Sequence, residues 1–378
     1  MSKRNNNIAI QEERKFNKIS VEIKGEEKEY NIYLAHNLIN DLANYISKYY
    51  HGIKIFLVTD ENVMNLYGDK VSTLLIDAGY ELTTFIVPAG EKSKTYEYFK
   101  KGHDLLIENE FKRDNLVLAL GGGVVGDLAG FIAATFMRGI PFVQIPTTLL
   151  AQVDSSVGGK TAINHSAGKN LIGAFYQPEF VLIDPNFLKT LDARELKTGL
   201  AEVLKHAFIA DLELISYLEE HVDDIFNYDV DSLIYIVYKS CQIKSSIVNQ
   251  DEKEKGMRAL LNFGHTIGHA LEAITDYEMY NHGEAVAVGM IGAANISYKK
   301  GKINENDYHI IINLIKKYAL PTSFQFNENP EKVYEKLFYD KKVKKNKLRW
   351  ILLESLGGAY IDEDVSQETV KEVLEVLA

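Results

Sequence analysis

The sequence predicts an α/β domain with a mostly parallel sheet, followed by a mainly α-helical domain. From Ile53 onward, short apolar runs alternate with longer amphipathic stretches, which is the pattern of successive βαβ units. Beyond about Phe187, apolar residues recur at helical spacing and few runs have strand character. The 378 residues also suit two domains at roughly 150 residues each. We therefore expect a polar tail at 1–18 and domains at 19–186 and 187–378.

The expected strands are short apolar runs bounded by polar or turn-forming residues. They lie at residues 54–60, 81–87, 115–120, 142–145 and 180–183. Between the first three, amphipathic stretches that end at Asp77 and extend from about Thr95 to Glu110 are predicted to be helices. Pro185 interrupts the chain after the last expected strand. In the second half, helices are expected at 194–210 and 232–248.

Composition and charge exclude several classes of protein. Hydrophobic residues make up 46% of the chain and charged residues 25%, which fits neither a disordered chain nor a fibrous repeat. The 53 acidic residues outnumber the 42 basic ones, and the resulting field of charge −11 repels nucleic acid. A focused basic pocket for a small phosphate is still compatible with this charge.

The remaining global features indicate a cytoplasmic protein. The single cysteine, Cys241, cannot form an intrachain disulfide, which favours a reducing compartment. The polar tail lacks the apolar segment of a secretory signal. The longest apolar region, 116–137, is interrupted by Asp127 and five glycines, so we expect no membrane span.

A glycine-rich turn follows the third expected strand. Residues 121–127 read GGGVVGD and match the G-x-G-x-x-G pattern, whose amides can approach a pyrophosphate at a helix N-terminus. The Rossmann fingerprint also has an acidic residue about 20 positions later, but 139–150 contains none. The motif fits either a dinucleotide bound in another manner or a tight turn. Asp60 and Glu91 follow other strands and could bind ribose hydroxyls, although a helix N-cap explains Asp60 equally well.

A long polar stretch after Gln144 interrupts an otherwise apolar region. It includes DSSVGGKT at 154–161 and GKN at 168–170. Buried polar groups are costly unless they meet a ligand or each other, so the stretch is predicted to be a binding loop. Lys160 and Lys169 suit anionic oxygens, with solvated surface lysines as the alternative. The spacing does not match a P-loop.

Three separated residues have the chemistry of a metal site. The run EVLKH at 202–206 places its polar side chains on one face of a predicted helix. Glu202, His265 and His282 would form a His₂Glu set, which leaves one position of a catalytic Zn²⁺ open. His265 and His269 could instead bind a metal together as in H-x-x-x-H helices, and a single histidine is often structural.

A basic run occupies residues 340–349. It carries six basic residues against one acidic residue in an acidic protein. Such a run is usually a solvated surface, and the alternative is a phosphate-binding arm.

Together these motifs resemble the 3-dehydroquinate synthases of the sugar-phosphate cyclase superfamily. The resemblance extends from about Ile53 to Arg349 and is most specific at 138–173 and in LNFGHTIGH at 261–269. It implies an NAD-binding α/β domain and a helical metal domain, with the active site in the cleft between them. One departure is the absence of a glycine near 33–37, where the family pattern has one.

The resemblance also implies a reaction. The substrate would be 3-deoxy-D-arabino-heptulosonate 7-phosphate, converted to 3-dehydroquinate and phosphate in the shikimate pathway of aromatic amino acid biosynthesis. The steps implied are transient oxidation by NAD, β-elimination of phosphate, re-reduction, ring opening and aldol closure. The implied cofactors are NAD and one divalent ion, Zn²⁺ or Co²⁺, and a homodimer is expected. The alternatives are another sugar-phosphate cyclase and an NAD- and metal-dependent polyol dehydrogenase.

The family pattern assigns roles to individual residues. The metal ligands would be Glu202, His265 and His282. The residues matched to NAD contacts, with Asp154 near the nicotinamide, are Asp60, Asn62, Glu91, Lys94, Gly123, Asp127, Thr147, Thr148, Asp154, Lys169 and Thr190. Those matched to the substrate phosphate are Arg138, Lys160, Asn170, Asn262, His269 and either Lys341 or Lys342. Lys244 and Arg258 are matched to the substrate carboxylate. Lys205 is matched to a further substrate contact.

Overall fold

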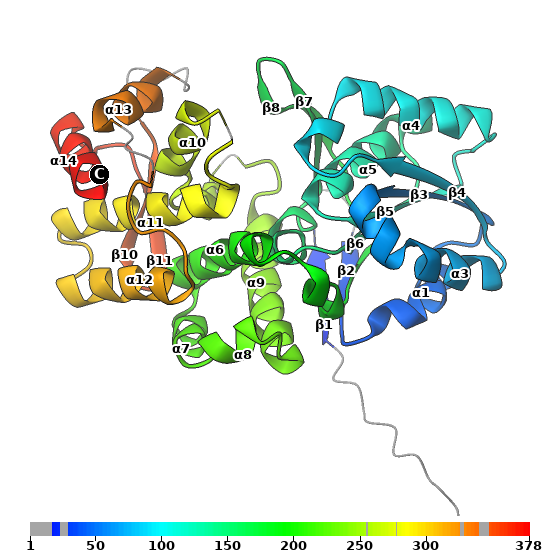
Figure 1. Cartoon of the computed structure of the whole chain (residues 1–378), viewed down its shortest axis with the longest axis horizontal. Coiled ribbons are helices and arrows are strands. Elements are labelled where there is room, and N and C mark those ends of the chain that lie inside the picture. The colour runs from blue at the N-terminus through cyan, green and yellow to red at the C-terminus, as the bar shows by residue number, and fades with distance from the viewer. Residues whose placement is uncertain (1–16, 23–28, 255, 277, 326–328, 340–347) are drawn as a thin grey trace, which may run out of the picture.

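The computed structural model describes the chain except for residues 1–16, 23–28, 255, 277, 326–328 and 340–347. Figure 1 shows two lobes, one built on a sheet with helices around it and one made mainly of helices. The basic run predicted at 340–349 falls mostly outside the described residues. The expected fold class, an α/β half followed by a mainly helical half, is confirmed.

The first lobe contains a seven-stranded sheet in the order β1-β2-β9-β6-β5-β3-β4. Its strands are β1 (Asn17–Glu22), β2 (Glu29–Leu34), β3 (Lys54–Asp60), β4 (Glu81–Val87), β5 (Leu116–Gly121), β6 (Phe142–Pro146) and β9 (Phe180–Ile183). Strand β1 pairs with β2 in antiparallel orientation, and the other neighbouring pairs of this sheet are parallel. Strand β1 begins at Asn17, so its first two residues lie within the expected polar tail.

Helices cover both faces of this sheet, which explains why its central strands are continuous apolar runs. Successive residues of β3 point to opposite faces. Ile55 and Leu57 pack in one core with residues of α1 (Leu42–Tyr49) and α3 (Asp69–Asp77). Phe56 and Val58 pack in the other core, whose helices are α4 (Tyr96–Glu108) and α5 (Gly123–Thr135).

The order of the strands creates a binding edge. Strand β3 lies between β4 and β5, so the chain crosses to opposite sides of β3 and makes a topological switch point there. The paired positions Thr59 with Leu120 and Gly121 with Pro146 show that the carboxyl ends of β3, β5 and β6 lie at one edge. Ligands of open α/β sheets bind at this edge, and the glycine-rich turn leaves β5 at that place.

The polar stretch predicted as a binding loop is partly a hairpin. Strands β7 (Lys160–His165) and β8 (Gly168–Phe175) pair in antiparallel orientation, and Figure 1 shows the hairpin projecting beside the gap between the lobes. Ile163 packs in the core beside α5, and the close approach of Thr161 to Gly130 holds β7 against that helix. Only a short part of the hairpin alternates between buried apolar and exposed polar residues. The polar residues around this part therefore dominate the sequence pattern.

The second lobe is built around a buried helix, α11 (His282–Lys299), whose residues from Gly283 to Ser297 are inside the protein except for the half-buried Glu284. A helix that is apolar on all sides belongs at the centre of its domain. Its other helices are α6 (Ala193–Ala210), α7 (Leu212–Glu220), α8 (Val222–Phe226), α9 (Val230–Gln250), α10 (His265–Ile274), α12 (Glu305–Lys317), α13 (Pro330–Tyr339) and α14 (Gln367–Leu377). A hairpin of β10 (Trp350–Ser355) and β11 (Gly358–Asp362), absent from the expectation, packs on α11.

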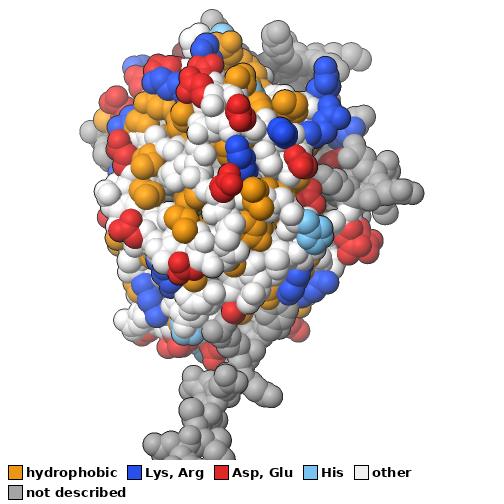
Figure 2. Space-filling model, turned by 90° about the vertical axis from the view of Figure 1, so that its right-hand side faces the viewer, with side chains coloured by type: hydrophobic (Ala, Val, Ile, Leu, Met, Phe, Trp, Pro, Cys, Tyr) orange, Lys and Arg blue, Asp and Glu red, His pale blue; other side chains and the backbone are white. Residues whose placement is uncertain are grey.

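Apolar residues on the outer surface are dispersed. Figure 2 shows the outer face of the α/β lobe, where hydrophobic side chains alternate with charged ones. Exposed isoleucines of this lobe include Ile53, Ile86 and Ile107, and dispersed apolar residues of this kind are ordinary on a protein surface. No helix of the described chain has the length and apolar character that a membrane crossing needs.

The contact between α10 and α11 depends on glycine. A Cβ added at Gly289 would lie 1.9 Å from the carbonyl oxygen of Gly264, so Gly289→Ala has to push the two helices apart. We expect the free energy of unfolding to fall by about 1–3 kcal/mol, measured by urea denaturation. Gly168→Ala is the control, because its nearest neighbour is the flexible end of Leu171 at 3.3 Å. Equal stability of the two variants would show that the helix contact does not require glycine.

Candidate active site

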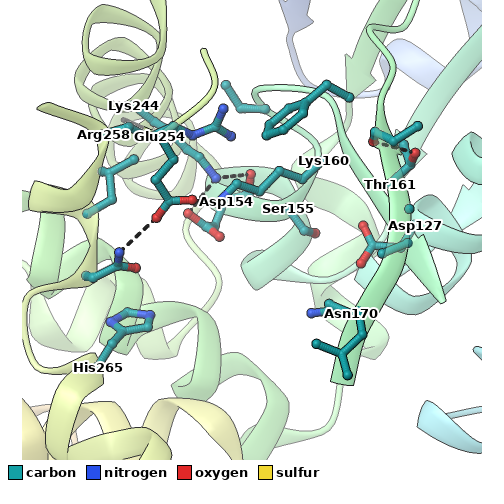
Figure 3. Close-up of a pocket in the computed structure, with 18 of the residues that line it drawn as sticks. Asp127, Asp154, Ser155, Lys160, Thr161, Asn170, Lys244, Glu254, Arg258 and His265 are labelled. Atoms are coloured by element: carbon teal, nitrogen blue, oxygen red, sulfur yellow. Dashed lines mark hydrogen bonds and ion pairs between the residues drawn. The ribbon is translucent and has the colours of Figure 1, made fainter. Parts of the chain in front are cut away.

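A cavity of about 550 Å³ lies where the two lobes meet. Its walls come from β7, β8 and the segment around Asp154 on one side, and from α6, α9 and residues 254–265 on the other (Figure 3). The volume is typical of a site for a small molecule. The charged side chains and the histidine in its lining are Asp127, Asp154, Lys160, Lys205, Lys244, Glu254, Arg258 and His265. Four cations among three carboxylates in the lining suit a polar ligand that carries anionic groups.

Three elements bring Glu202, His265 and His282 together. Glu202 lies inside α6, while the histidines are the first residues of α10 and α11. Glu202 Oε1 lies 3.6 Å from His265 Nε2 and 3.5 Å from His282 Nε2, and the three possible ligand atoms lie within 4.8 Å of one another. His269 belongs instead to a second group, with Glu272 and His282.

The environment of Glu202 fits a divalent ion. Its side chain is only 1% exposed, and Oε1 has no hydrogen-bond partner among the described residues. The other carboxylate oxygen accepts a hydrogen bond from Lys205, one turn along the same helix. A buried carboxylate oxygen without a partner is costly, whereas a metal ion between it and two imidazole nitrogens would satisfy all three.

Further contacts orient the two imidazoles. His265 Nδ1 lies 3.2 Å from the carbonyl oxygen of Phe263, and His282 Nδ1 lies 3.5 Å from Glu272 Oε2. Contacts of this kind hold Nδ1 and leave Nε2 as the ligand atom, as is usual for histidines that bind metals. Glu272 was not predicted from the sequence, although it follows His269 by three residues on the same helix.

The protonation states of the three residues differ. Burial opposes the charge of Glu202, but Lys205 and the neighbouring histidines outweigh it and hold its pKa well below the usual range. Burial also lowers the pKa of His265 well below 6.5, so this imidazole is neutral. For His282, burial is outweighed by the attraction of the Glu202 and Glu272 carboxylates, each 3.5 Å from a ring nitrogen, which raises the pKa to about 10.

The glycine-rich turn lies at the switch point in close contact with other segments. A Cβ added at Gly122 would lie 3.0 Å from Thr148 Cγ2, and one at Gly123 would lie 2.8 Å from Ser155 Oγ. Gly122 is the N-cap of α5, so backbone amides and the positive end of a helix face the binding edge. This arrangement fits the pyrophosphate of a dinucleotide.

Asp60 is a helix N-cap, the structural role that was the alternative to a ribose contact. Its Oδ1 accepts hydrogen bonds from the backbone amides of Asn62 at 2.9 Å and Val63 at 3.1 Å, which caps the helix after β3. A ribose contact by Asp60 stays a prediction. Glu91 Oε2 accepts a hydrogen bond of 2.6 Å from Asn164 in the hairpin.

Four further residues matched to NAD contacts, Lys94, Thr147, Thr148 and Thr190, lie in segments that follow strands of this sheet. Lys94 forms an ion pair with Asp127 on α5. The amide of Thr147 donates to the carbonyl oxygen of Gly121 at 3.0 Å. Thr148 Oγ1 accepts from the amide of residue 151 at 3.1 Å, and Thr190 Oγ1 lies 2.5 Å from the hydroxyl of Tyr67.

On the substrate side, each lysine has a carboxylate partner. Lys244 Nζ donates to Asp154 Oδ1 and to its backbone oxygen, both at 2.6 Å. Burial lowers the pKa of Lys244 to about 8, while for Asp154 the nearby lysines outweigh burial and hold the pKa well below its usual range. Lys160 pairs with Glu254, which was not predicted because no spacing in the sequence marks it.

Arg258 links the two lobes in this structure. Its guanidinium donates to the backbone oxygens of Gly158, at 3.1 Å, and Glu252. It also lies 5.8 Å from the ring centroid of Phe175. A role in binding a substrate carboxylate stays a prediction.

Arg138 and His269, two of the residues matched to the phosphate, are absent from the lining of the cavity. Arg138 is exposed and follows α5, near the amino end of β6, and it is absent from the described lining. The binding edge is at the opposite, carboxyl ends of these strands. Lys341 and Lys342 lie outside the described residues.

The fold and the site of this protein are those of the sugar-phosphate cyclases. The structure is similar to 2-epi-5-epi-valiolone synthase from Streptomyces hygroscopicus subsp. jinggangensis 5008 with NAD⁺ and Zn²⁺ bound, at 28% identity, with a TM-score of 0.85 and coverage of 93% of this chain and 97% of that one. It is also similar to 2-deoxy-scyllo-inosose synthase complexed with carbaglucose-6-phosphate, NAD⁺ and Co²⁺, at 25% identity, a TM-score of 0.84 and coverage of 96% and 100%. A glycerol dehydrogenase from Schizosaccharomyces pombe, 16% identical with a TM-score of 0.65 and coverage of 90% and 87%, shares the fold.

Within this class, the chain belongs to the 3-dehydroquinate synthase family. Models of the N-terminal and C-terminal parts of 3-dehydroquinate synthase match residues 84–198 and 199–343. The protein named 3-dehydroquinate synthase from Desulforamulus reducens is 47% identical over 92% of this chain and 97% of its own length. The one from Clostridium acetobutylicum is 44% identical over 93% and 98%. The family predicted from the motifs is confirmed.

Removing the charge of the buried carboxylate should prevent metal binding. We expect Glu202→Gln to weaken the affinity for Zn²⁺ or Co²⁺ by more than about 100-fold, because a neutral amide replaces an anionic ligand. Metal content after dialysis, measured by mass spectrometry, checks this. Glu195→Gln on the same helix is the control and should retain the metal. A metal-replete Glu202→Gln protein would remove Glu202 from the ligand set.

Metal affinity should also depend on pH. Glu202 and His265 have lowered pKa values and are ready to bind at neutral pH, whereas His282 must first lose a proton. The affinity should therefore rise about tenfold per pH unit as the pH increases toward the His282 pKa of about 10. Titration of metal-free protein with Co²⁺ at several pH values, followed by absorbance, measures this slope. A flat profile would show that His282 is already neutral.

Proposed function

We propose that the protein is a 3-dehydroquinate synthase, a phosphate-eliminating carbon–oxygen lyase of the shikimate pathway. It would convert 3-deoxy-D-arabino-heptulosonate 7-phosphate to 3-dehydroquinate and phosphate. The observation that carries the proposal is the cavity between the lobes, whose lining includes His265 of the Glu202, His265 and His282 group together with four cationic side chains. Membership of the 3-dehydroquinate synthase family supports the choice of substrate.

The residues present fit the two cofactors. Glu202, His265 and His282 would hold Zn²⁺ or Co²⁺, and the residues around Gly123 at the carboxyl edge of the sheet would hold NAD. When bound, NAD takes up and returns a hydride, and the divalent ion makes a substrate hydroxyl more acidic. The unpartnered oxygen of Glu202 and the tight turn at the switch point support these assignments. So do the NAD⁺ and metal ions of the two similar cyclases.

The substrate carries negative charge at two ends, and the cavity offers donors for both. Lys160, Asn170 and Asn262 would bind the phosphate. Lys244 and Arg258 would bind the carboxylate, with Lys205 close to the metal ligands as a further contact. Arg138 lies outside the lining, so we leave it out of the phosphate site of a single chain.

These side chains act mainly by orientation. Fixing reacting groups in a closed site can supply ~7–11 kcal/mol of a barrier. The departing phosphate can serve as its own base, so the surrounding donors position it and need not transfer protons. Lys244, with a pKa lowered to about 8 by burial, can hold or release a proton near neutral pH.

The setting of the enzyme is part of the proposal. We place it in the cytoplasm, on the basis of its single cysteine, and expect a homodimer from the family resemblance. The domain boundary is proposed near residue 187, between β9 and α6, where a short 3₁₀ segment (Pro185–Thr190) connects the lobes.

One assay separates this function from its alternatives. The purified protein is loaded with NAD and metal and supplied with the heptulosonate phosphate, and released phosphate and NADH are followed in the same tube. We expect phosphate release with no net NADH, because the hydride returns to the substrate. Accumulating NADH would indicate a polyol dehydrogenase, and turnover of a different sugar phosphate alone would indicate another cyclase.

Lys160 should matter for turnover and not for the cofactor. Its side chain reaches the cavity from β7, away from the glycine-rich turn. We expect Lys160→Ala to lower kcat/KM by about 100-fold or more, as loss of a charged donor in an active site does. NAD binding, measured by fluorescence titration, should stay within about twofold of the unmodified protein. Lys112→Ala, at an exposed lysine, is the control; parallel loss of NAD binding and turnover would refute the assignment.

A further inference from the structure

The Glu254 carboxylate lies between two donors on the anion-binding side of the cavity. One of its oxygens accepts a hydrogen bond from Lys160 Nζ, and the other accepts one of 2.9 Å from Asn262 Nδ2. Figure 3 shows Glu254 among the cavity residues, with its carboxylate directed inward. Both donors belong to the set that we propose for the substrate phosphate. The Glu254 carboxylate therefore already occupies two of the donors that we propose for the phosphate.

The loop after α9 holds Glu254 in this position. Asp251 Oδ2 accepts hydrogen bonds from the amides of Gly256, at 2.6 Å, and Arg258, at 3.1 Å. Glu254 has a φ of 54°, in the left-handed region that glutamate seldom adopts. An unfavourable backbone conformation persists where the surrounding structure enforces it, often at a functional site. The loop is thus built to present this side chain to the cavity.

The charge of Glu254 is stable at neutral pH. Burial favours its neutral form, but the hydrogen bonds from Lys160 and Asn262 outweigh burial and lower the pKa. A phosphate group and this carboxylate would repel each other at hydrogen-bond distance from the same donors. Charge repulsion thus opposes simultaneous occupation of the site by both.

We propose that the Glu254 carboxylate is an internal competitor for the phosphate group. It pairs with Lys160 and Asn262 between turnovers, gives up these donors when the phosphate of the substrate binds, and takes them back as free phosphate leaves. No covalent bond changes in this exchange. The consequence is weaker retention of product phosphate and selection against ligands whose anionic group is too weak to displace the carboxylate. This inference rests on the proposed function.

A different role for Glu254 predicts the opposite result. The ammonium of Lys160 and the amide of Asn262 each have more than one N–H, so Glu254 could orient them while they also bind phosphate. In that case, removal of the carboxylate would weaken phosphate binding. If the carboxylate competes, its removal strengthens phosphate binding.

The test measures inorganic phosphate binding to the NAD- and metal-loaded protein by calorimetry. Glu254→Gln removes the charge and keeps one acceptor oxygen, so the side chain keeps its size but can no longer accept from Lys160 and Asn262 through separate oxygens. We expect phosphate to bind about tenfold more tightly than to the unmodified protein, and to inhibit turnover at correspondingly lower concentration. Unchanged or weaker binding by the folded variant would overturn the proposal.

Matched variants isolate the effect. Glu252→Gln removes a nearby carboxylate that bonds Gln177 at 3.0 Å and is not part of the described lining, so it should leave phosphate affinity unchanged. Adding Lys160→Ala to Glu254→Gln should abolish the gain. If the glutamine variant does not fold, Glu254→Asp serves instead: its shorter reach should strengthen phosphate binding by a smaller factor, and no gain would overturn the proposal.

The enzymatic activity and the competitor role of Glu254 are tested by different measurements. Phosphate binding is measured without turnover, so its result does not depend on the identity of the organic substrate. Failure of the unmodified enzyme to release phosphate from the heptulosonate phosphate would count against the proposed function. An active enzyme whose Glu254→Gln variant gains no phosphate affinity would count against the competitor role alone.

Discussion

The burial of an ionised carboxylate at Glu202 is the constraint on which the site depends. Removing a charge from water is costly unless partners compensate for it. Lys205 compensates one oxygen from the same helix, and two imidazoles from other helices face the second. That convergence requires α6, α10 and α11 to pack closely, and Cβ atoms at Gly283 and Gly289 would prevent it. Close packing at these glycines therefore allows the Glu202, His265 and His282 side chains to meet.

The cavity is electrostatically balanced by the protein's own residues. Lys160, Lys205 and Lys244 are each paired with a carboxylate that lies in or beside the cavity. A ligand therefore exchanges partners with the protein and does not enter a field of free cations. Such exchange favours ligands that present enough charge, at the right separation, to replace the internal partners. It also lets a protein of charge −11 bind a phosphorylated acid.

Local pattern predicts the elements whose burial is uniform. The predicted strand at 54–60 has its observed limits because a parallel strand covered on both faces is a continuous apolar run. The predicted strand at 81–87 also has its observed limits, although it is an edge strand that is buried only at Phe85 and Val87. The hairpin of β7 and β8 differs from the predicted loop, since β8 is largely exposed and few residues of the hairpin are buried, which leaves no strong apolar alternation in the sequence. The hairpin of β10 and β11 follows the basic run and has no counterpart among the predicted elements, although Gly357, with a φ of 74°, marks the turn between its two strands.

The sequence by itself determined the family, the fold class and the chemical types available for the site. It could name Glu202 and His265 as ligand candidates because their residue types and motifs are local properties of the chain. Only the tertiary structure decided which groups meet: that Glu272 contacts His282, that Glu254 takes the donors expected for phosphate, and that Arg138 lies away from the cavity. The reason is physical. Such contacts join residues far apart in the chain, and their distances are set by how helices and strands pack.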